Sequence, residues 1–438
     1  MKKIIITIIG AGSSYTPELI EGLILRHEEL PIGELRLVDI DEHNGKQKME
    51  IIYDLTLRML KKYNLDWIVS KTLDRRSAIK GADFVLTQIR VGALQARVKD
   101  ERIPLSHGML GQETNGPGGL FKLLRTLPVM IEIANDIAEL APKAWMINFT
   151  NPSGMVTEGL LKYAKHKKVL GLCNVPIGML GAISKNLEIP EEELFVKMGG
   201  LNHFVFGLEV VHNGINKMEE LLGKFSNESY LTMNNIAEYN YEPHFVKNLG
   251  ILLCGYHNYY FNKQSALNKE IAAYEKNKTR AEEVVRLEKS LFEKYKDPTL
   301  NIKPIELSYR GGARYSEVAC ELVNQIYNNK GTYQVVNTIN NGTIVDLPYD
   351  SAIEATSIID KDGAHPLNIG HLPIQVRGIT MAMKSFEIVA VDAAIEKDIE
   401  KAFLALAINP LTSNLEVARK VFDELCEAHK EYLPWNRN

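Results

Sequence analysis

Two glycines and an aspartate near the start of the chain have the types and spacing of residues that bind a dinucleotide. Gly10 and Gly12 lie between an apolar run, residues 4–9, and a helical pattern, residues 16–28. One glycine permits a tight turn, and the other lets the backbone approach a pyrophosphate at the helix N-terminus. Asp39 lies near the end of the next predicted strand, residues 34–40, where a carboxylate accepts hydrogen bonds from ribose hydroxyls.

A carboxylate at Asp39 also disfavours a 2′-phosphate, so the pattern predicts NAD rather than NADP. The third glycine of the usual fingerprint is absent, because Tyr15 stands in its place. A tight turn that binds no ligand would show the same two glycines, and this alternative stays open on the pattern alone. The predicted cofactor-binding residues are Gly10, Gly12, Ser13, Ser14, Tyr15 and Asp39.

The elements that must position these residues are short apolar runs that alternate with helical patterns. Such alternation predicts right-handed crossovers and a Rossmann-type, doubly wound parallel sheet over residues 1–172. The predicted strands cover residues 4–9, 34–40, 67–70, 84–88, 145–147 and 169–172.

The second part of the chain, residues 173–438, has a different order of predicted strands and helices. Residues 194–211 are a long β-type stretch broken by Gly199 and Gly200, and residues 246–295 are largely helical. We expect a C-terminal mixed α/β (α+β) domain, packed on the first with a cleft between them, as in malate and lactate dehydrogenases. The charge-rich helix over residues 278–296 is expected to be a solvated face or a subunit contact.

Composition excludes several classes of protein. The 438 residues carry 51 basic and 55 acidic side chains, a net charge of −4, which argues against a nucleic-acid-binding protein. No apolar run approaches ~18 residues, so neither a transmembrane helix nor a membrane partner is expected. Residues 4–9 read as a buried strand rather than a signal peptide, and we expect a cytoplasmic protein. Four widely separated cysteines exclude a disulfide scaffold: Cys173, Cys254, Cys320 and Cys426.

Five segments together resemble the family 4 glycoside hydrolases, and among them the branch that acts on 6-phospho-β-glucosides. Each segment alone would be ambiguous, but all occur in the family's order along nearly the whole chain. NAD-dependent enzymes of this family are exceptions to glycoside hydrolysis by two carboxylates. The segments are residues 10–19, 111–119, 148–154, 171–176 and 200–203.

The resemblance implies a redox route to hydrolysis. NAD+ takes hydride from C3 of the sugar, while a divalent metal, Mn2+ in most members, holds the C2 and C3 oxygens. The ketone left at C3 makes the C2 proton acidic. A base then removes this proton, and the C1 leaving group is eliminated. Water adds to the product, and NADH returns the hydride. The family commonly forms dimers or tetramers, so a homodimer or homotetramer is expected.

The family motifs place the metal ligands at Cys173 and His203, although their spacing is not by itself a metal signature. A thiolate and an imidazole suit a borderline metal better than Mg2+. The family's tyrosine base maps onto Tyr256, although Tyr259 or Tyr260 would follow from a small alignment slip. Without the family, these tyrosines would read as an aromatic face packed on the core. A tyrosine of pKa ~10 needs a nearby positive charge to act as a base.

The resemblance also assigns substrate contacts. Arg97 and Arg310 are expected to hold the 6-phosphate, because guanidinium groups bind phosphate bidentately. Arg90 is a further candidate that could instead line the cofactor. Asn151 is expected to bind hydroxyls near C3.

Two more residues concern specificity and the metal. Asn174 follows the metal cysteine where members acting on α-linked sugars carry an aspartate, so it favours the β branch. The amide has no proton to give a leaving group, and a leaving-group acid stays unassigned. Glu113 is a candidate for a polar or water-mediated role near the metal.

Three other functions remain as alternatives. A 6-phospho-α-glucosidase or another family 4 glycosidase would share most of these residues. A 2-hydroxy-acid dehydrogenase would share the fold but accumulate NADH, and would have no use for Cys173, His203 and Tyr256. A non-catalytic NAD-binding regulator would turn over no phosphosugar.

Overall fold

A 13-stranded mixed sheet runs through the computed structural model, which describes residues 3–225, 241–310 and 314–436. Its first part is parallel, in the order β3-β2-β1-β4-β5-β6, the order of a dinucleotide-binding fold. The predicted doubly wound sheet is confirmed, and each predicted strand lies within two residues of an observed one. These strands are β1 (Ile4–Ile9), β2 (Ile32–Val38), β3 (Ile68–Thr72), β4 (Phe84–Thr87), β5 (Trp145–Asn148) and β6 (Val169–Gly171).

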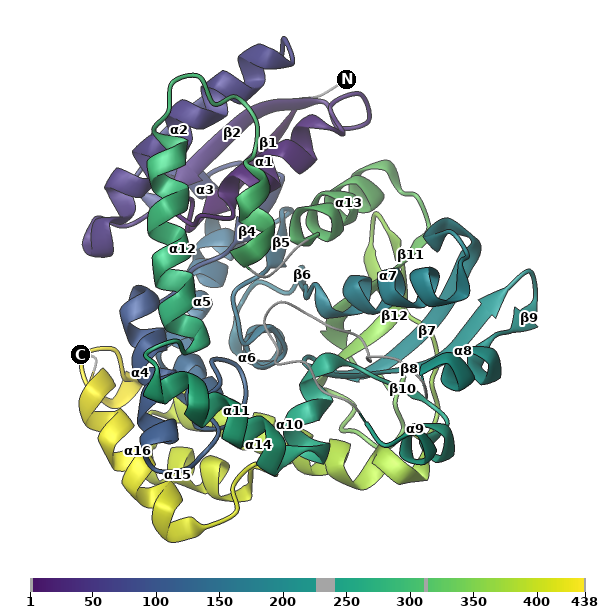
Figure 1. Ribbon diagram of the computed structural model, residues 1–438. Helices are drawn as coiled ribbons and strands as arrows, with labels where there is room; N and C mark the ends of the chain where they lie inside the picture. The colour runs from purple at the N-terminus through teal and green to yellow at the C-terminus, as the bar shows by residue number, and fades with distance from the viewer. Residues whose placement is uncertain (1–2, 226–240, 311–313, 437–438) are drawn as a thin grey trace.

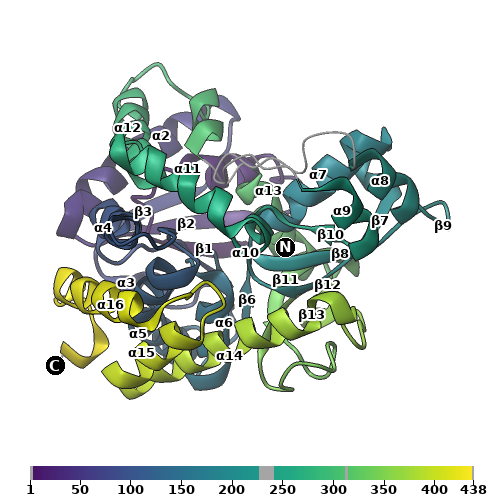
Figure 2. The same cartoon turned by 60° about the horizontal axis from the view of Figure 1, so that its bottom comes forward.

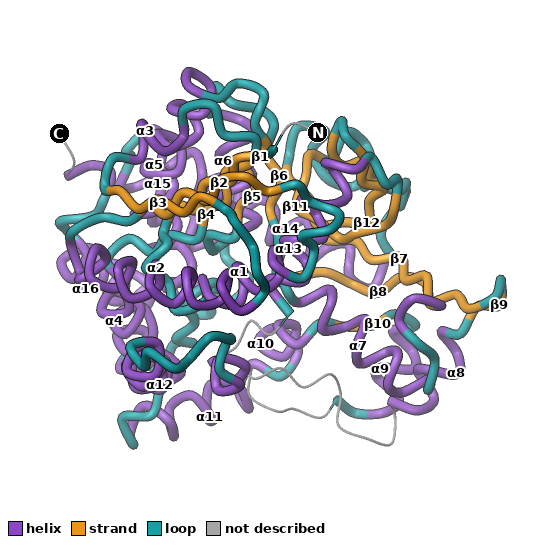
Figure 3. The backbone as a smooth tube through the Cα atoms, turned by 90° about the horizontal axis from the view of Figure 1, so that it is seen from above, coloured by secondary structure: helices purple, strands orange, loops and turns teal. Residues whose placement is uncertain are grey.

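The helices of this part lie on both faces of the sheet, as Figure 3 shows from above. They are α1 (Thr16–Ile24), α2 (Gly45–Lys62), α3 (Arg75–Ile79), α4 (Ala93–Ser106), α5 (Gly116–Leu140) and α6 (Ser153–Tyr163). The next helix, α7 (Val175–Leu187), instead contacts the antiparallel part of the sheet. Strand β1 reads Ile-Ile-Ile-Thr-Ile-Ile because both of its faces are covered. Ile6 and Ile8 pack toward α1 and α2, whereas Ile9 packs toward α5.

The sheet becomes antiparallel beyond β6, where β11 pairs with it at Asn337 and Gly171. The stretch predicted as one long β segment is a hairpin of β7 and β8, but its break lies at Asn202 and His203. The predicted break at Gly199 and Gly200 is wrong, because both lie inside β7. A Cβ on Gly199 would lie 2.1 Å from a methyl of Ile369, so this glycine serves packing. The strands are β7 (Leu194–Leu201), β8 (Phe204–His212), β9 (Ile215–Asn216), β10 (Leu252–Leu253), β11 (Thr332–Ile339), β12 (Ala352–Asp360) and β13 (Gly363–Pro366).

Helices late in the chain return to the first part of the sheet (Figures 1 and 2). Helix α13 packs on α1, α12 on α2 and α4, and α14 on α5 and α6. Among the described helices, none has the length and apolar character needed to cross a bilayer. The helices are α8 (Met218–Phe225), α9 (Pro243–Leu249), α10 (Asn258–Phe261), α11 (Lys263–Glu275), α12 (Arg280–Tyr295), α13 (Tyr315–Asn328), α14 (Ile374–Glu396), α15 (Ile399–Ile408) and α16 (Leu415–His429). Short 3-10 turns are η1 (Glu42–Asn44), η2 (Glu191–Glu193), η3 (Gly255–His257), η4 (Ile305–Arg310) and η5 (Pro434–Asn436).

A buried ion pair ties the last long helix to the first part of the chain. Asp100 of α4 pairs with Arg125 of α5 through both carboxylate oxygens, and His429 Nε2 of α16 lies 3.0 Å from Asp100 Oδ1. All three side chains are fully buried.

Asp100→Asn should destabilise the fold by about 3–5 kcal/mol, because it leaves the Arg125 charge without a counterion. Urea unfolding measures this, and Asp362→Asn, in an exposed pair with Lys361, is the control and should change stability far less.

Candidate active site

The carboxyl ends of the parallel strands open onto a cavity of about 670 Å³. Gly10 follows β1, Asp39 follows β2, Gln88 follows β4 and Asn151 follows β5, and all four line the cavity. Ligands of doubly wound sheets bind at this edge, where the strand order reverses on either side of β1. The volume lies within the range that suits a small ligand or cofactor.

The glycine turn is held tightly against its neighbouring strands. Gly10 has a φ of +86°, and a Cβ there would lie 2.8 Å from the carbonyl oxygen of Gln88. The Gly12 amide donates to Asp39 Oδ2 at 2.5 Å, and a Cβ on Gly12 would lie 2.7 Å from that oxygen. Burial raises the pKa of Asp39, while hydrogen bonds from the Ile40 and Gly12 amides oppose the shift. Asp39 therefore both braces the turn and faces the cavity.

Two of the three other predicted cofactor-binding residues line the cavity, and one does not. Ser13 and Tyr15 line the cavity. Ser14 is buried and does not line the cavity, and its hydroxyl donates to Glu288 Oε2 at 3.3 Å. The Arg310 guanidinium lies over the Tyr15 ring, 4.2 Å from its centroid. Arg310 is thus part of the wall of the cofactor cavity.

Glu288 is a cavity residue that sequence reasoning missed. It accepts from Lys48 Nζ at 2.6 Å and from Arg310 at 3.2 Å. The expected solvated face exists, because Arg286, Lys289 and Glu293 are exposed. The other face of α12, which the expectation of a solvated face or subunit contact did not include, packs on α2 and α4 and carries the buried Glu288. A signal was available, since Glu288 shares the helical i, i+3, i+4, i+7 stripe with Leu291, Phe292 and Tyr295.

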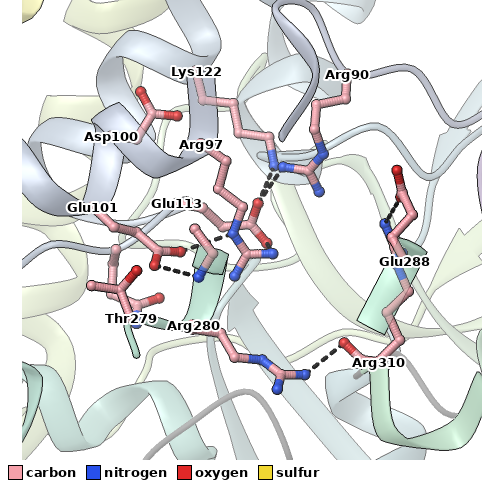
Figure 4. Close-up of polar contacts among 12 residues, drawn as sticks. Arg90, Arg97, Asp100, Glu101, Glu113, Lys122, Thr279, Arg280, Glu288 and Arg310 are labelled. Atoms are coloured by element: carbon pink, nitrogen blue, oxygen red, sulfur yellow. Dashed lines mark hydrogen bonds and ion pairs between the residues drawn. The ribbon is translucent and has the colours of Figure 1, made fainter. Parts of the chain in front are cut away.

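Three cations converge on one carboxylate, Glu113, as Figure 4 shows, and two of them, Arg90 and Lys122, line the cavity. Glu113 pairs with Arg90 at 2.5 Å, Arg97 at 3.2 Å and Lys122 at 2.9 Å. These cations hold the pKa of Glu113 well below its usual range, although burial opposes them. Burial, with Arg90 nearby, lowers the pKa of Lys122 to about 7. Arg97 also pairs with Glu101 at 2.8 Å, so three cations share two carboxylates.

The sequence pointed to Arg90, Arg97 and Glu113 but not to Lys122, which is 2% exposed on α5. A lysine within a helical stretch gives no sign that it is buried. The two arginines predicted for the phosphate do not share a partner here. Arg97 binds Glu101 and Glu113, whereas Arg310 binds Glu288.

Cys173, His203 and Tyr256 lie together beside this cluster. Cys173 follows β6, and His203 occupies the β7–β8 turn with a φ of +59°. The Tyr256 ring stacks on the His203 ring, with centroids 4.0 Å apart and planes at 10°. The Tyr256 phenol interacts electrostatically with Cys173 and Glu113, and burial raises its pKa.

The donor pair fits a borderline divalent metal. Burial lowers the pKa of His203 to about 3, so its imidazole is neutral and able to ligate. Burial raises the pKa of the Cys173 thiol, and a metal ion would have to displace its proton. Across the described residues, no group of three or more His, Cys, Asp and Glu side chains is placed to hold a metal. Two protein donors occupy only part of the coordination sphere of a divalent metal, so the pair would leave positions for oxygens from outside the chain.

The neighbouring tyrosines are engaged elsewhere. Tyr259 OH accepts from Gln112 Nε2 at 2.7 Å, and Tyr260 OH accepts from Asn115 Nδ2 at 3.2 Å. His257 Nδ1 is bonded to the backbone of Cys254. Tyr256 is thus the aromatic side chain that contacts the expected metal ligand.

Asn151 and Asn174 differ in position. Asn151 lines the cavity, and its side chain accepts from the Ser153 amide at 3.3 Å. Asn174 stands at the N-cap of α7 directly after Cys173, and it does not line the cavity.

Comparisons with known proteins agree with this geometry. Residues 5–189 match the model of the family 4 glycosyl hydrolases, and residues 198–412 match the model of their C-terminal domain. The chain belongs to family 4 of the glycosyl hydrolases.

Named relatives cover nearly the whole chain. A probable 6-phospho-beta-glucosidase of Bacillus subtilis is 53% identical over 430 residues, covering 98% of this chain and 97% of the relative. A 6-phospho-beta-glucosidase of Escherichia coli is 45% identical over 438 residues, covering 99% and 97%.

Solved structures match the whole chain as well. The 6-phospho-beta glucosidase of Thermotoga maritima, solved with manganese, NAD+ and glucose-6-phosphate, has a TM-score of 0.89 at 33% identity, covering 98% of this chain and 99% of that one. Malate dehydrogenase of Plasmodium falciparum, with a TM-score of 0.53 at 15% identity and 91% and 99% coverage, shares the fold alone. The predicted likeness to malate dehydrogenases is thus confirmed for the fold.

Proposed function

We propose that this chain hydrolyses 6-phospho-β-glucosides to glucose 6-phosphate and an aglycone, with bound NAD and Mn2+. The observation that carries the proposal is the meeting of Cys173, His203 and Tyr256 next to the cavity of the glycine turn. The 45–53% identical relatives bear the names of enzymes with this activity.

The two parts of the chain divide the work. Residues 1–172 hold the dinucleotide through Gly10, Gly12 and the carboxylate of Asp39. Residues 173–438 supply the metal ligands and the base. One continuous sheet carries both groups of residues. His203 interacts electrostatically with Lys122, which lines the cavity, and this proximity supports the division.

The first task of the chain is to hold the metal and the sugar. Cys173, as a thiolate, and His203, as a neutral imidazole, are the proposed ligands. When bound, NAD+ accepts and returns a hydride at C3 of the sugar, and Mn2+ polarises the C3 oxygen as a Lewis acid. Asn151 orients hydroxyls near C3 from the end of β5.

The second task is proton removal at C2, which we assign to the Tyr256 hydroxyl. Burial favours the neutral phenol, so Tyr256 needs added positive charge nearby before it can accept a proton. The Tyr256 ring stacks on the His203 ring, and a cation held by His203 would supply that charge. The buried, water-poor surroundings strengthen that effect.

The third task is recognition of the 6-phosphate, for which Arg97 and Arg310 remain our proposed ligands. Each arginine is paired with a carboxylate. A phosphate would therefore either displace that carboxylate or bind the same guanidinium beside it. The surplus of three cations over two carboxylates around Glu113 supports anion binding at this end of the site.

The substrate proposal is tested with nitrophenyl glucosides under reducing conditions, with NAD+ and Mn2+ present. Release of p-nitrophenol is compared for the β-glucoside 6-phosphate, its α-anomer and the unphosphorylated β-glucoside. We expect rapid release only from the first. Faster release from the α-anomer would assign the chain to the other branch of the family, against the expectation from Asn174.

Gly12→Val should weaken NAD+ binding by at least about tenfold. The added Cβ would lie 2.7 Å from Asp39 Oδ2 and 2.9 Å from the Gly45 carbonyl oxygen, so the turn would have to move off the pyrophosphate position. Fluorescence titration with NADH measures the affinity. Gly214→Val, in the open turn between β8 and β9, is the control; equal weakening in both variants would contradict the assignment.

We further propose that the enzyme is a cytoplasmic homodimer or homotetramer. Sedimentation velocity of the purified chain tests the oligomer, and a purely monomeric species at assay concentrations would contradict it.

A further inference from the structure

A buried carboxylate behind the proposed metal ligands has no role in the reaction described above. Glu354 lies on β12, and its side chain is fully buried. Its Oε1 accepts two hydrogen bonds, from Asn202 Nδ2 at 3.1 Å and from Asn337 Nδ2 at 2.9 Å. Its Oε2 has no hydrogen-bond partner within the described part of the chain.

The two asparagines belong to the two segments that carry the proposed ligands. Asn337 pairs with Gly171 where β11 meets β6, and Gly171 lies two residues before Cys173. Asn202 is the residue before His203 in the β7–β8 turn. Through one oxygen, Glu354 therefore connects the strand pair that precedes Cys173 with the turn that carries His203.

The His203 turn needs such support. His203 has a φ of +59°, a conformation that a side-chain-bearing residue keeps only when its surroundings impose it. The Asn202 side chain is fixed at both ends, because its Oδ1 also accepts from the Gly154 amide at 3.1 Å. A Cβ on Gly154 would lie 2.6 Å from the Asn202 Cβ, so the side chain has little room to turn.

We propose that Glu354 is a positioning residue that fixes the separation of Cys173 and His203 for the metal. The inference rests on the metal pair of the proposed function. Residues that orient metal ligands typically change metal affinity 10- to 100-fold when they are removed. Glu354→Ala would remove the acceptor that the Asn202 and Asn337 side chains share and free the turn from the strand.

The carboxylate charge is not what this role requires. Burial raises the pKa of Glu354 to about 8, so its neutral form resembles a glutamine amide in shape and in its accepting oxygen. Glu354→Gln therefore keeps both hydrogen bonds from the asparagines and is the conservative variant that should restore positioning.

The experiment is titration of the metal-free protein with Co2+, followed by the absorption that arises when a thiolate binds this ion. Wild type should show the band, and Cys173→Ser should lack it. Glu354→Ala should bind Co2+ at least about tenfold more weakly than wild type, and Glu354→Gln within about threefold. Asn324→Ala is the matched control, because Asn324 is a fully buried asparagine of α13 that binds Glu29 instead.

Asn202→Ala provides a second route to the answer if Glu354→Ala does not fold. It keeps the carboxylate but cuts its link to the turn, and it should also weaken Co2+ binding at least about tenfold. Wild-type affinity in Glu354→Ala or Asn202→Ala, or an equal loss in Asn324→Ala, would overturn the inference while leaving the metal pair intact. A missing thiolate band in wild type would instead contradict the metal pair itself, and the inference with it.

Discussion

Replacing Cys173 by serine should lower metal-dependent turnover by at least about 10³-fold in a chain that remains folded. A serine hydroxyl stays protonated where a thiol can ionise, so it is a poor ligand for a borderline metal. The residue pair would then hold the ion through His203 alone. Because the reaction needs the C3 oxygen polarised, kcat/KM should fall with the metal occupancy. The measurement is kcat/KM as a function of Mn2+ concentration.

Cys320→Ser is the matched control for this variant. Cys320 is also fully buried, but it lies in α13 and its thiol donates to the Leu19 carbonyl oxygen at 3.4 Å. Any general cost of burying a hydroxyl should appear in both variants, whereas loss of Mn2+ dependence should appear only at Cys173. Full activity in Cys173→Ser with unchanged Mn2+ dependence would remove Cys173 from the site.

Replacing Tyr256 by phenylalanine should lower kcat by about 10²- to 10⁴-fold, the range for loss of a general base. The phenyl ring preserves the stacking on His203, so NAD+ and Mn2+ affinities should change little. A second readout is specific to the proposed role. In deuterated water the wild type should exchange the C2 hydrogen of the sugar with solvent, and Tyr256→Phe should lose that exchange.

Tyr259→Phe distinguishes the base from its neighbour. The Tyr259 hydroxyl is bonded to Gln112, so its removal should leave C2 exchange in place. Exchange that persists in Tyr256→Phe and vanishes in Tyr259→Phe would transfer the role to Tyr259. Exchange that persists in both would exclude both residues as the base.

The parallel half of the fold was predictable because its central strands β1, β4 and β5 are buried on both faces and read as nearly unbroken apolar runs. The position of the β7–β8 turn at Asn202 and His203 was not predictable, because Gly199 and Gly200 look like a turn in the sequence. Only the tertiary contact of Gly199 with Ile369 explains a glycine in the middle of that strand.

The candidate site could be predicted where a motif marks its residues, but not where tertiary contact alone brings residues together. The family motifs led to Cys173, His203 and Tyr256, which do lie together. Glu288 carried a signal, because it shares a helical stripe with Leu291, Phe292 and Tyr295. Lys122 in α5 and Glu354 in β12 carried none. Their burial becomes visible only when helices and strands from both halves meet.

Cofactor dependence tests the central claim most directly. The purified enzyme is stripped of NAD and metal, both absences are verified, and hydrolysis of p-nitrophenyl β-glucoside 6-phosphate is measured with NAD+ and Mn2+ added separately and together. The account predicts activity only with both, and no accumulation of NADH during many turnovers. Undiminished hydrolysis by the stripped enzyme would contradict it.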